Sequence, residues 1–309
     1  ADELKAIIDD IYEHYTVSSN PEITLEANPD DLNQEKVREL KSTLINRFSI
    51  GIQSFYMEDL IWMNRAHNSR EAESAVKRVQ DAGFENITVD LIYGYPLLSN
   101  EKWDSNIRRV IDFGVPHVSA YSMTVEPATA LASFINKGKQ PAMDEAQSAD
   151  QFVMLMESMN EAGFDHYEIS NFAKPGKYSR HNSNYWNRVP YLGIGPSAHS
   201  FKDSTRQWNI ANNNRYMDSI GKGIIPAEVE NLTEANRINE YIMTSLRTAS
   251  GMDLDKVSLS FGSNYRSVIE NELSKFSENE WVDQKGSLVT LTTTGKLYAD
   301  HIASELFVE

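Results

Sequence analysis

Residues 86–93 read Asn-Ile-Thr-Val-Asp-Leu-Ile-Tyr, and this run of apolar and β-branched residues predicts a buried strand. The run follows an amphipathic segment that ends at Asp81-Ala82-Gly83-Phe84. Glycine just past a last helical turn can adopt the left-handed conformation that satisfies the final carbonyls, so Gly83 marks the end of a helix. A helix that stops directly before a strand is typical of a fold built from βα repeats.

The same order of elements repeats through the first half of the chain. Gly114 and Gly163 end two more helices in the same way, and Ser69 and Ser99 are expected to cap helix N-termini. Strands that alternate with helices indicate βαβ units with right-handed crossovers, and therefore a parallel sheet or an α/β barrel. The predicted strands are 22–27, 47–53, 86–93, 117–124 and 166–170, after an initial helix over 1–15.

The chain has 309 residues, with 29 Lys and Arg against 45 Asp and Glu, which gives a net charge of −16. A protein that binds nucleic-acid backbone needs clustered basic residues, so we expect no nucleic-acid partner. The apolar runs are far shorter than the ~20 residues of a membrane-spanning helix, and no basic-then-apolar leader opens the chain. We therefore expect a soluble cytoplasmic protein with a small ligand.

Cysteine is absent from the sequence, which excludes disulfides, thiolate nucleophiles and cysteine-held zinc or iron–sulfur sites within this chain. The chain begins at Ala1 rather than at methionine, inside a predicted helix that no strand precedes. We therefore expect the sequence to be part of a longer protein.

Polar residues stand at the predicted carboxyl ends of four successive strands. Parallel α/β folds place ligands and catalytic groups at these ends, so a shared site is predicted there. For any single residue the alternative is a helix cap or a partner for loop amides. The residues are Glu26, Gln53, Asp90 with Tyr93, and Thr124 with Glu126.

Two further segments follow the repeats, and the predicted divisions are 1–172, 173–232 and 233–309. The middle segment is rich in Gly, Asn, Tyr and Trp, and at Gly193 and Gly195 the backbone could approach a ligand closely. The last segment predicts two helices, a hairpin and a final helix, as in a winged-helix-like module. Its acidic balance favours packing or a protein partner over DNA.

Four segments at the strand ends resemble a known family in their order and spacing. That family is oxygen-independent coproporphyrinogen III oxidase and its relatives among radical S-adenosylmethionine (SAM) enzymes. The segments are 23–29 (Ile-Thr-Leu-Glu-Ala-Asn-Pro), 48–55 (Phe-Ser-Ile-Gly-Ile-Gln-Ser-Phe), 64–67 (Asn-Arg-Ala-His) and 89–96 (Val-Asp-Leu-Ile-Tyr-Gly-Tyr-Pro). Residues 180–186 (Arg-His-Asn-Ser-Asn-Tyr-Trp) resemble the H-N-x-x-Y-W signature of the heme-chaperone branch, HemW, and we favour this branch over the oxidase.

The resemblance implies an incomplete TIM-like α/β barrel of the radical SAM type, acting in porphyrin metabolism or in delivery of heme to a hemoprotein acceptor. It also implies SAM and a 4Fe-4S iron–sulfur cluster, whose reduction leads to hydrogen abstraction by an adenosyl radical. The family's C-x-x-x-C-x-x-C loop, which holds the cluster, and its G-G-G-T-P segment are absent from this sequence. We therefore expect the chain as given to be inactive, and to be a radical SAM oxidoreductase only with the N-terminal segment restored.

The resemblance assigns six residues to SAM. Glu26 and Asp90 are carboxylates that suit an ammonium group or ribose hydroxyls, and Arg65 suits a carboxylate. The alternative for Arg65 is a surface salt bridge, and the alternative for Asp90 is a buried ion pair with that arginine. The six residues are Glu26, Gln53, Arg65, Asp90, Thr124 and His199. The last two differ in type from the family's contacts.

The resemblance also implies a heme site in the H-N-x-x-Y-W segment. His181 is the expected axial ligand or edge contact of heme iron, and Tyr185 and Trp186 are expected to offer flat surface to the macrocycle. The alternative is a loop histidine bonded to backbone, with both aromatic rings inside a core. No catalytic residue and no other metal ligand is assigned.

Two other functions stay open on the sequence. A metal-independent α/β-barrel hydrolase would use Glu26, Asp90 or Glu126 as acid and base and would need a closed barrel. A non-catalytic heme carrier would bind heme through the aromatic segment without any cluster. The radical SAM hypothesis instead predicts an open barrel with an exposed edge at the first strand.

Overall fold

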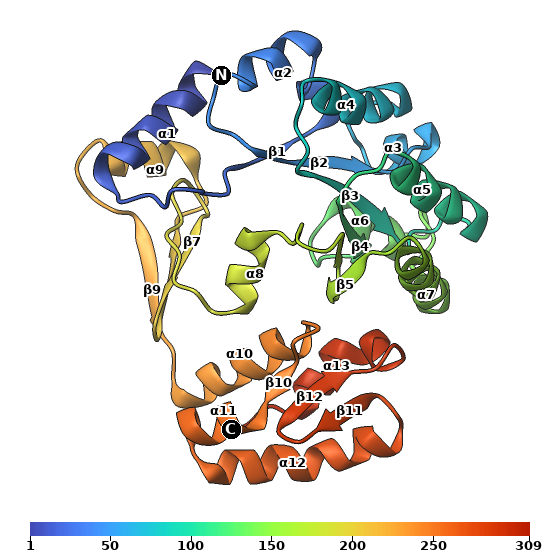
Figure 1. The fold of residues 1–309 in the computed structure, drawn as a ribbon, viewed down its shortest axis with the longest axis vertical. Coiled ribbons are helices and arrows are strands. Elements are labelled where there is room, and N and C mark those ends of the chain that lie inside the picture. Colours follow the sequence, from blue (N-terminus) through green and yellow to red (C-terminus); the bar gives the residue numbers. More distant parts are fainter. The chain divides into compact units, whose positions relative to one another are not determined.

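The structure is a computed structural model that describes residues 1–309. The chain divides into two compact units, Ala1–Ser179 and Arg180–Glu309, and each is described by itself. Figure 1 shows both units as ribbons. The three-part division made from the sequence stays a prediction.

The first unit is built on a six-stranded sheet with the order β1-β2-β3-β4-β6-β5. Strands β1 to β4 run parallel, β6 is antiparallel to β4, and β5 is antiparallel to β6. The sheet stays open with β1 and β5 at its edges, so the predicted partial α/β barrel is confirmed and the closed hydrolase barrel is not formed. The bounds are β1 Thr24–Ala27, β2 Arg47–Gln53, β3 Ile87–Tyr93, β4 His117–Ser122, β5 Asp165–Glu168 and β6 Asn171–Ala173.

Helices connect these strands, and α4, α5 and α7 lie along one side of the sheet (Figure 1). Gly83, Gly114 and Gly163 follow these three helices with positive φ, as predicted. Ser99 caps α5, but Asn68 caps α4 through a capping box, so Ser69 is not a cap. The bounds are α1 Asp2–His14, η1 Pro29–Asp31, α2 Gln34–Leu40, α3 Met57–Trp62, α4 Ser69–Asp81, α5 Asn100–Asp112, α6 Ala130–Asn136 and α7 Glu145–Glu161.

The two faces of the sheet differ because successive side chains of a strand point to opposite sides. Ile50, Ile52, Val89 and Leu91 are buried apolar residues of β2 and β3. Toward α5 and α7, the Tyr93 ring stacks on Phe152. The opposite face of the same strands carries polar side chains, which are Arg47, Ser49, Gln53, Thr88 and Asp90.

The second unit begins with the short helix α8 (Arg180–Trp186) and continues into an antiparallel sheet of order β7-β8-β9. The sequence did not predict this sheet. Tyr191 extends it, since its backbone N–H and C=O bond to Phe201 at 2.9 and 3.0 Å. The bounds are β7 His199–Lys202, β8 Thr205–Asn209, β9 Ala227–Asn231 and the intervening helix α9 Asn213–Ile220.

The C-terminal part of this unit has helices followed by a hairpin and a last helix, as predicted for a winged-helix-like module. The hairpin strands β11 and β12 pair in register, and the short β10 adds to β12. Helix α11 was not predicted. The bounds are α10 Glu234–Leu246, β10 Met252–Asp253, α11 Leu254–Phe261, α12 Ser263–Glu278, β11 Val282–Lys285, β12 Leu288–Leu291, η2 Gly295–Tyr298 and α13 Ala299–Glu305.

Candidate functional site

Three polar side chains converge above Gly51 on the polar face of β2. A methyl group built on Gly51 would lie 2.9 Å from Gln53 Nε2, 3.4 Å from Arg65 Nη2 and 3.8 Å from Asn28 Oδ1. Arg65 Nη2 also donates to Asn28 Oδ1 at 2.6 Å. Because Gly51 has no side chain, Gln53, Arg65 and Asn28 can gather directly above it at the carboxyl end of the sheet.

Arg65 and Gln53 both have features that favour a ligand. Arg65 donates to Asn28 and to the Gly51 carbonyl but forms no ion pair with a carboxylate, so neither the surface salt bridge nor the pair with Asp90 exists. Gln53 ends β2 with φ of 66°, a left-handed conformation that is uncommon for a residue with a side chain. Such outliers gather at binding sites, where the surrounding structure enforces them.

Asp90 lies on the same face of the next strand. Ser49 Oγ is 3.2 and 3.1 Å from its two carboxylate oxygens. The pKa of Asp90 is raised to about 6, mainly by burial and in part by the Glu26 charge, against the lowering effect of hydrogen bonds from Ser49 and Ser119 and of the Arg47 charge. The exposed Glu26 and the buried Asp90 are therefore close enough for their charges to interact.

Below these groups, toward the amino ends of the strands, lies a buried layer that sequence reasoning missed. The Arg47 side chain is buried and bonds to the hydroxyls of Thr88 and Thr24. His117 Nε2 bonds to the Tyr167 hydroxyl at 2.7 Å. Burial, together with the smaller effect of the Arg47 charge, lowers the pKa of His117 to about 3, so the imidazole is neutral.

The remaining strand-end residues lie elsewhere. Tyr93 was predicted to face the shared site, but its ring points to the helix side and stacks on Phe152 at 6.0 Å between ring centroids. Thr124 and Glu126 are exposed in the loop that follows β4. The assignment of Thr124 to SAM stays a prediction.

The two cofactors that the family implies differ in how well they fit this chain. The cluster above Gly51 contains the Arg65 guanidinium, which forms no ion pair, and the neighbouring strand carries the Asp90 carboxylate. These groups fit a ligand with both a carboxylate and cationic or hydroxyl groups, as SAM has. The cluster does not fit, because the chain has no cysteine and no group of three or more His, Asp or Glu that could hold a metal. No step through the cluster is assigned.

The predicted heme residues lie on α8 in the second unit. The His181 ring meets the Tyr185 ring edge-on at 4.7 Å, and Tyr185 meets Tyr191 in the same way at 4.6 Å. Trp186 instead packs under the guanidinium of Arg247 at 5.3 Å, and Arg247 pairs with Asp300 at 3.0 Å. The structure thus joins His181 and Tyr185 and gives Trp186 a packing contact with the C-terminal module.

His199 begins β7 in the second unit and its ring lies 6.3 Å from that of Trp208. Its assignment to SAM stays a prediction. Gly193 does not serve a ligand, because any side chain there would clash with the backbone of His199. The glycine therefore lets residues 191–193 lie directly along β7.

An ionic network that the sequence did not reveal fixes the chain just after α8. The Glu240 carboxylate on α10 pairs with Arg188 at 3.4 Å and with Arg206 of β8. Arg188 Nη1 also donates to the Arg237 carbonyl at 2.6 Å. Burial lowers the pKa of the Arg188 guanidinium, whereas the Glu240 charge raises it. Glu240 thereby holds the chain directly after the H-N-x-x-Y-W segment (180–186) against α10. We call this segment the heme motif.

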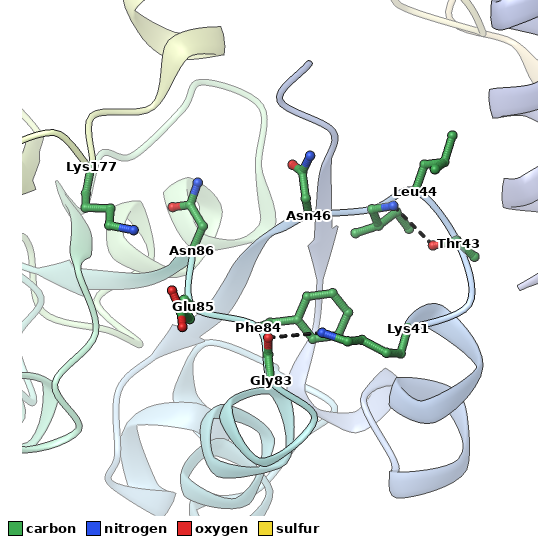
Figure 2. A pocket seen from close by; sticks show the side chains of 10 residues that line it. Lys41, Thr43, Leu44, Asn46, Gly83, Phe84, Glu85, Asn86 and Lys177 are labelled. Carbon is green, nitrogen blue, oxygen red and sulfur yellow. Dashed lines mark hydrogen bonds between the residues drawn. The ribbon is translucent and has the colours of Figure 1, made fainter. Parts of the chain in front are cut away.

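A hollow of about 500 Å³ opens at the amino ends of β2 and β3, and Figure 2 shows its lining. Lys41 Nζ donates to the Gly83 carbonyl at 3.0 Å and lies over the Phe84 ring. Lys41 therefore joins the end of α2 to the end of α4. Contacts at the amino ends of parallel strands usually stabilise the fold, and we assign this hollow no ligand.

Family models match residues 2–120 as Radical SAM superfamily and residues 232–298 as HemN C-terminal domain. The heme chaperone HemW of Bacillus subtilis is 32% identical over 303 residues, which are 97% of this chain and 80% of that protein. The chain belongs to the HemW family. HemW of Lactococcus lactis is 29% identical, over 96% of this chain and 78% of that protein.

A solved structure supports the HemW-family fold. The coproporphyrinogen III oxidase HemN from Escherichia coli superimposes with a TM-score of 0.82 at 18% identity, covering 99% of this chain and 74% of that one. The family prediction made from the H-N-x-x-Y-W segment is confirmed. None of the helices in the structure combines the length and hydropathy needed to cross a bilayer.

Proposed function

We propose that this chain is a heme carrier of the HemW type, with His181 as the axial ligand of heme iron and a hemoprotein as the acceptor. The observation that carries the proposal is the series of ring contacts from His181 to Tyr185, both exposed on α8, and on to Tyr191 beyond the helix. The similar proteins of Bacillus subtilis and Lactococcus lactis are named heme chaperones. Imidazole nitrogen is a common axial ligand of heme iron.

The residues around His181 have separate tasks in this proposal. Tyr185 stands at 89° to the imidazole and so limits its rotation, which orients the ligating nitrogen. Tyr191 offers a second ring on the far side of Tyr185. Arg247 holds Trp186, which is the last residue of the helix. The helix is only seven residues long, so these contacts, rather than helix propensity, keep it in place.

SAM is proposed to bind on the polar face of the first unit. Arg65 would pair with its carboxylate, Gln53 would bond to its polar groups, and Asp90 with Glu26 would face its ammonium or ribose hydroxyls. SAM supplies an adenosyl group when it is bound. The chain's own residues orient that group, and the lack of a side chain at Gly51 lets Gln53 and Arg65 come together beside it.

Hemin titration followed at the Soret band tests the heme proposal. The native chain should bind hemin with a shifted Soret band, and His181→Ala should weaken binding at least about tenfold, which corresponds to the loss of one axial bond. His14→Ala, at the exposed end of α1, is the matched control and should bind as the native chain does. Equal binding by His181→Ala and the native chain would remove His181 from the account.

A further inference from the structure

The strand β9 (Ala227–Asn231) forms an open edge of the antiparallel sheet in the second unit. The sheet has the order β7-β8-β9, so β9 pairs with a neighbouring strand on one side only. All of its residues pair with β8 in an uninterrupted register, so no bulge turns the edge away from solvent. An edge of this kind presents backbone N–H and C=O groups to which another extended chain can bond. The proposed heme function does not use this edge.

Two backbone bonds that flank β9 show which of its groups face β8. The Leu232 N–H donates to the Ser204 carbonyl at 2.8 Å, and the Ile210 N–H donates to the Pro226 carbonyl at 2.9 Å. Bonded and non-bonded pairs alternate along an antiparallel ladder, so every second residue of β9 between these points bonds to β8. The bonded residues are Glu228 and Glu230.

The residues that alternate with them direct their backbone groups away from β8. The N–H and C=O groups of Val229 and Asn231 point outward, and no segment of residues 1–309 bonds to them. They are two residues apart, which is the spacing at which one strand bonds to the next. The Val229 side chain is 59% exposed, so the middle of the edge is uncovered. The edge therefore has the free groups and the space that an added strand needs.

The side chains of β9 decide which strand can pair there. Glu228 and Glu230 lie on one face of the strand and Val229 lies on the other, because successive side chains alternate. Arg206 stands opposite Glu230 across the ladder, but it pairs with Glu240, and neither glutamate of β9 forms an ion pair.

These acidic side chains disfavour a second copy of the same edge, since like charges opposite each other destabilise a pair of strands. Opposite charges stabilise such a pair. A strand with basic residues on one face and apolar residues on the other complements Glu228 and Glu230 as well as Val229.

We propose that the β9 edge binds an extended segment of a partner protein in which basic and apolar residues alternate, and that this segment adds a strand to the sheet. Its basic side chains lie beside Glu228 and Glu230, and an apolar side chain packs against Val229. The outward backbone groups of Val229 and Asn231 bond to the backbone of the segment. In strand addition, main-chain hydrogen bonds give affinity and the alternate side chains give specificity.

Fluorescence anisotropy with a labelled peptide of alternating lysine and valine tests the backbone part of this proposal. The native chain should bind this peptide and should bind the same peptide with every backbone nitrogen methylated at least about tenfold more weakly, because the donors are lost. Val229→Pro removes an N–H that makes no bond to β8, and proline is tolerated at such positions of edge strands. It should weaken peptide binding at least about tenfold. Val229→Ala keeps the N–H, so it is the matched control and should bind within about threefold of the native chain.

A charge reversal tests the choice of a basic partner. Glu228→Lys should weaken binding of the alternating peptide about fivefold, because repulsion replaces attraction. Glu278→Lys, at an exposed position at the end of α12, makes the same change of net charge away from the edge and should bind as the native chain does. Unchanged binding by Glu228→Lys would refute the basic partner.

The remaining outcomes decide whether a strand is added at all. Absence of peptide binding, equal binding of the methylated peptide, or native-like binding by Val229→Pro would each refute strand addition at β9. Circular dichroism and the unfolding midpoint verify that each variant is folded, and should Val229→Pro fail to fold, the methylated peptide decides with the native chain alone. Self-association of the native chain that Val229→Pro abolishes in sedimentation velocity would give the edge to a second copy and overturn the proposal.

Discussion

Replacing Glu240 with glutamine tests whether the ionic network holds the heme motif segment in place. The carboxylate is the only anion between Arg188 and Arg206, and the amide of glutamine has the same shape without the charge. The variant therefore leaves two guanidinium groups near each other with no counter-charge. Packing changes little, so the effect on stability reports the charge.

The exposure of each partner sets the expected size of the effect. Breaking a buried pair by removing one partner costs about 3–5 kcal/mol, whereas an exposed pair contributes about 0.2–1 kcal/mol. The Glu240 and Arg188 side chains are 16% and 18% exposed, and Arg206 is 35% exposed. The pair with Arg188 thus approaches the buried limit and the pair with Arg206 does not, so we expect Glu240→Gln to cost about 2–3 kcal/mol.

Urea unfolding followed by tryptophan fluorescence measures this cost. Glu270→Gln is the matched control, because Glu270 pairs with Arg266 one turn away on the exposed side of α12, and it should cost about 0.5 kcal/mol or less. Arg188→Gln should lower the free energy of unfolding more than Arg206→Gln, because the Arg188 side chain is more buried. A Glu240→Gln variant no less stable than the control would refute the assignment of this network to the stability of the second unit.

Three further changes test the first unit and the α8 anchor. Burial raises the pKa of Asp90 to about 6, so the folded state holds this proton more tightly than the unfolded chain does. The protonated carboxyl therefore contributes at most about 3 kcal/mol to the free energy of unfolding. This contribution is present below pH 4 and is lost as the pH rises through 6. Asp90→Asn should therefore be more stable than the native chain at pH 8 and equal at pH 4 in urea unfolding; a constant difference would contradict this. Gly51→Ala should lower SAM affinity about tenfold in equilibrium dialysis, because the added methyl group meets the Gln53 and Arg65 side chains. The unfolding midpoint should stay the same, because Gly51 has no positive φ that alanine would strain. Gly221→Ala is the control, and an unchanged affinity of Gly51→Ala would place SAM elsewhere. Trp186→Phe keeps a ring under Arg247, and since Trp186 Nε1 has no partner, hemin binding should stay within about twofold; a larger loss in the Soret titration would mean that the indole itself contacts heme.

The parallel strands of the first unit were predictable because local sequence dictates them. The β2 segment 47–53 has the predicted bounds, and helix-ending glycines separate the repeats. The β7–β9 sheet was missed for a physical reason. Residues 205–209 read Thr-Arg-Gln-Trp-Asn, with polar groups on both faces, so no period of two in hydropathy marks them as a strand. Their pairing with β7 and β9 decides the structure, and pairing is not a local property.

The site was predictable only in part, for a similar reason. Glu26, Gln53 and Asp90 follow from their positions at strand ends, where parallel folds bind ligands. The roles of Gly51 and Asn28 could not be predicted in this way. They depend on the register between β1 and β2 and on the contact of Arg65 with the sheet, and neither can be read from the sequence. Tyr93 was assigned to the wrong side, because one residue along a strand reverses the face to which its side chain points.

The contacts of α8 also connect it to the C-terminal module. The helix is too short to be stable alone, and two links from the module side fix its C-terminal end. Arg247 and Asp300 hold Trp186, and Glu240 holds Arg188 just beyond it. Glu240 belongs to α10, Arg247 is the C-cap of α10, and Asp300 belongs to α13. Arg247 and Glu240, one basic and one acidic residue of the module, therefore fix the end of the His181 helix from two separate contacts.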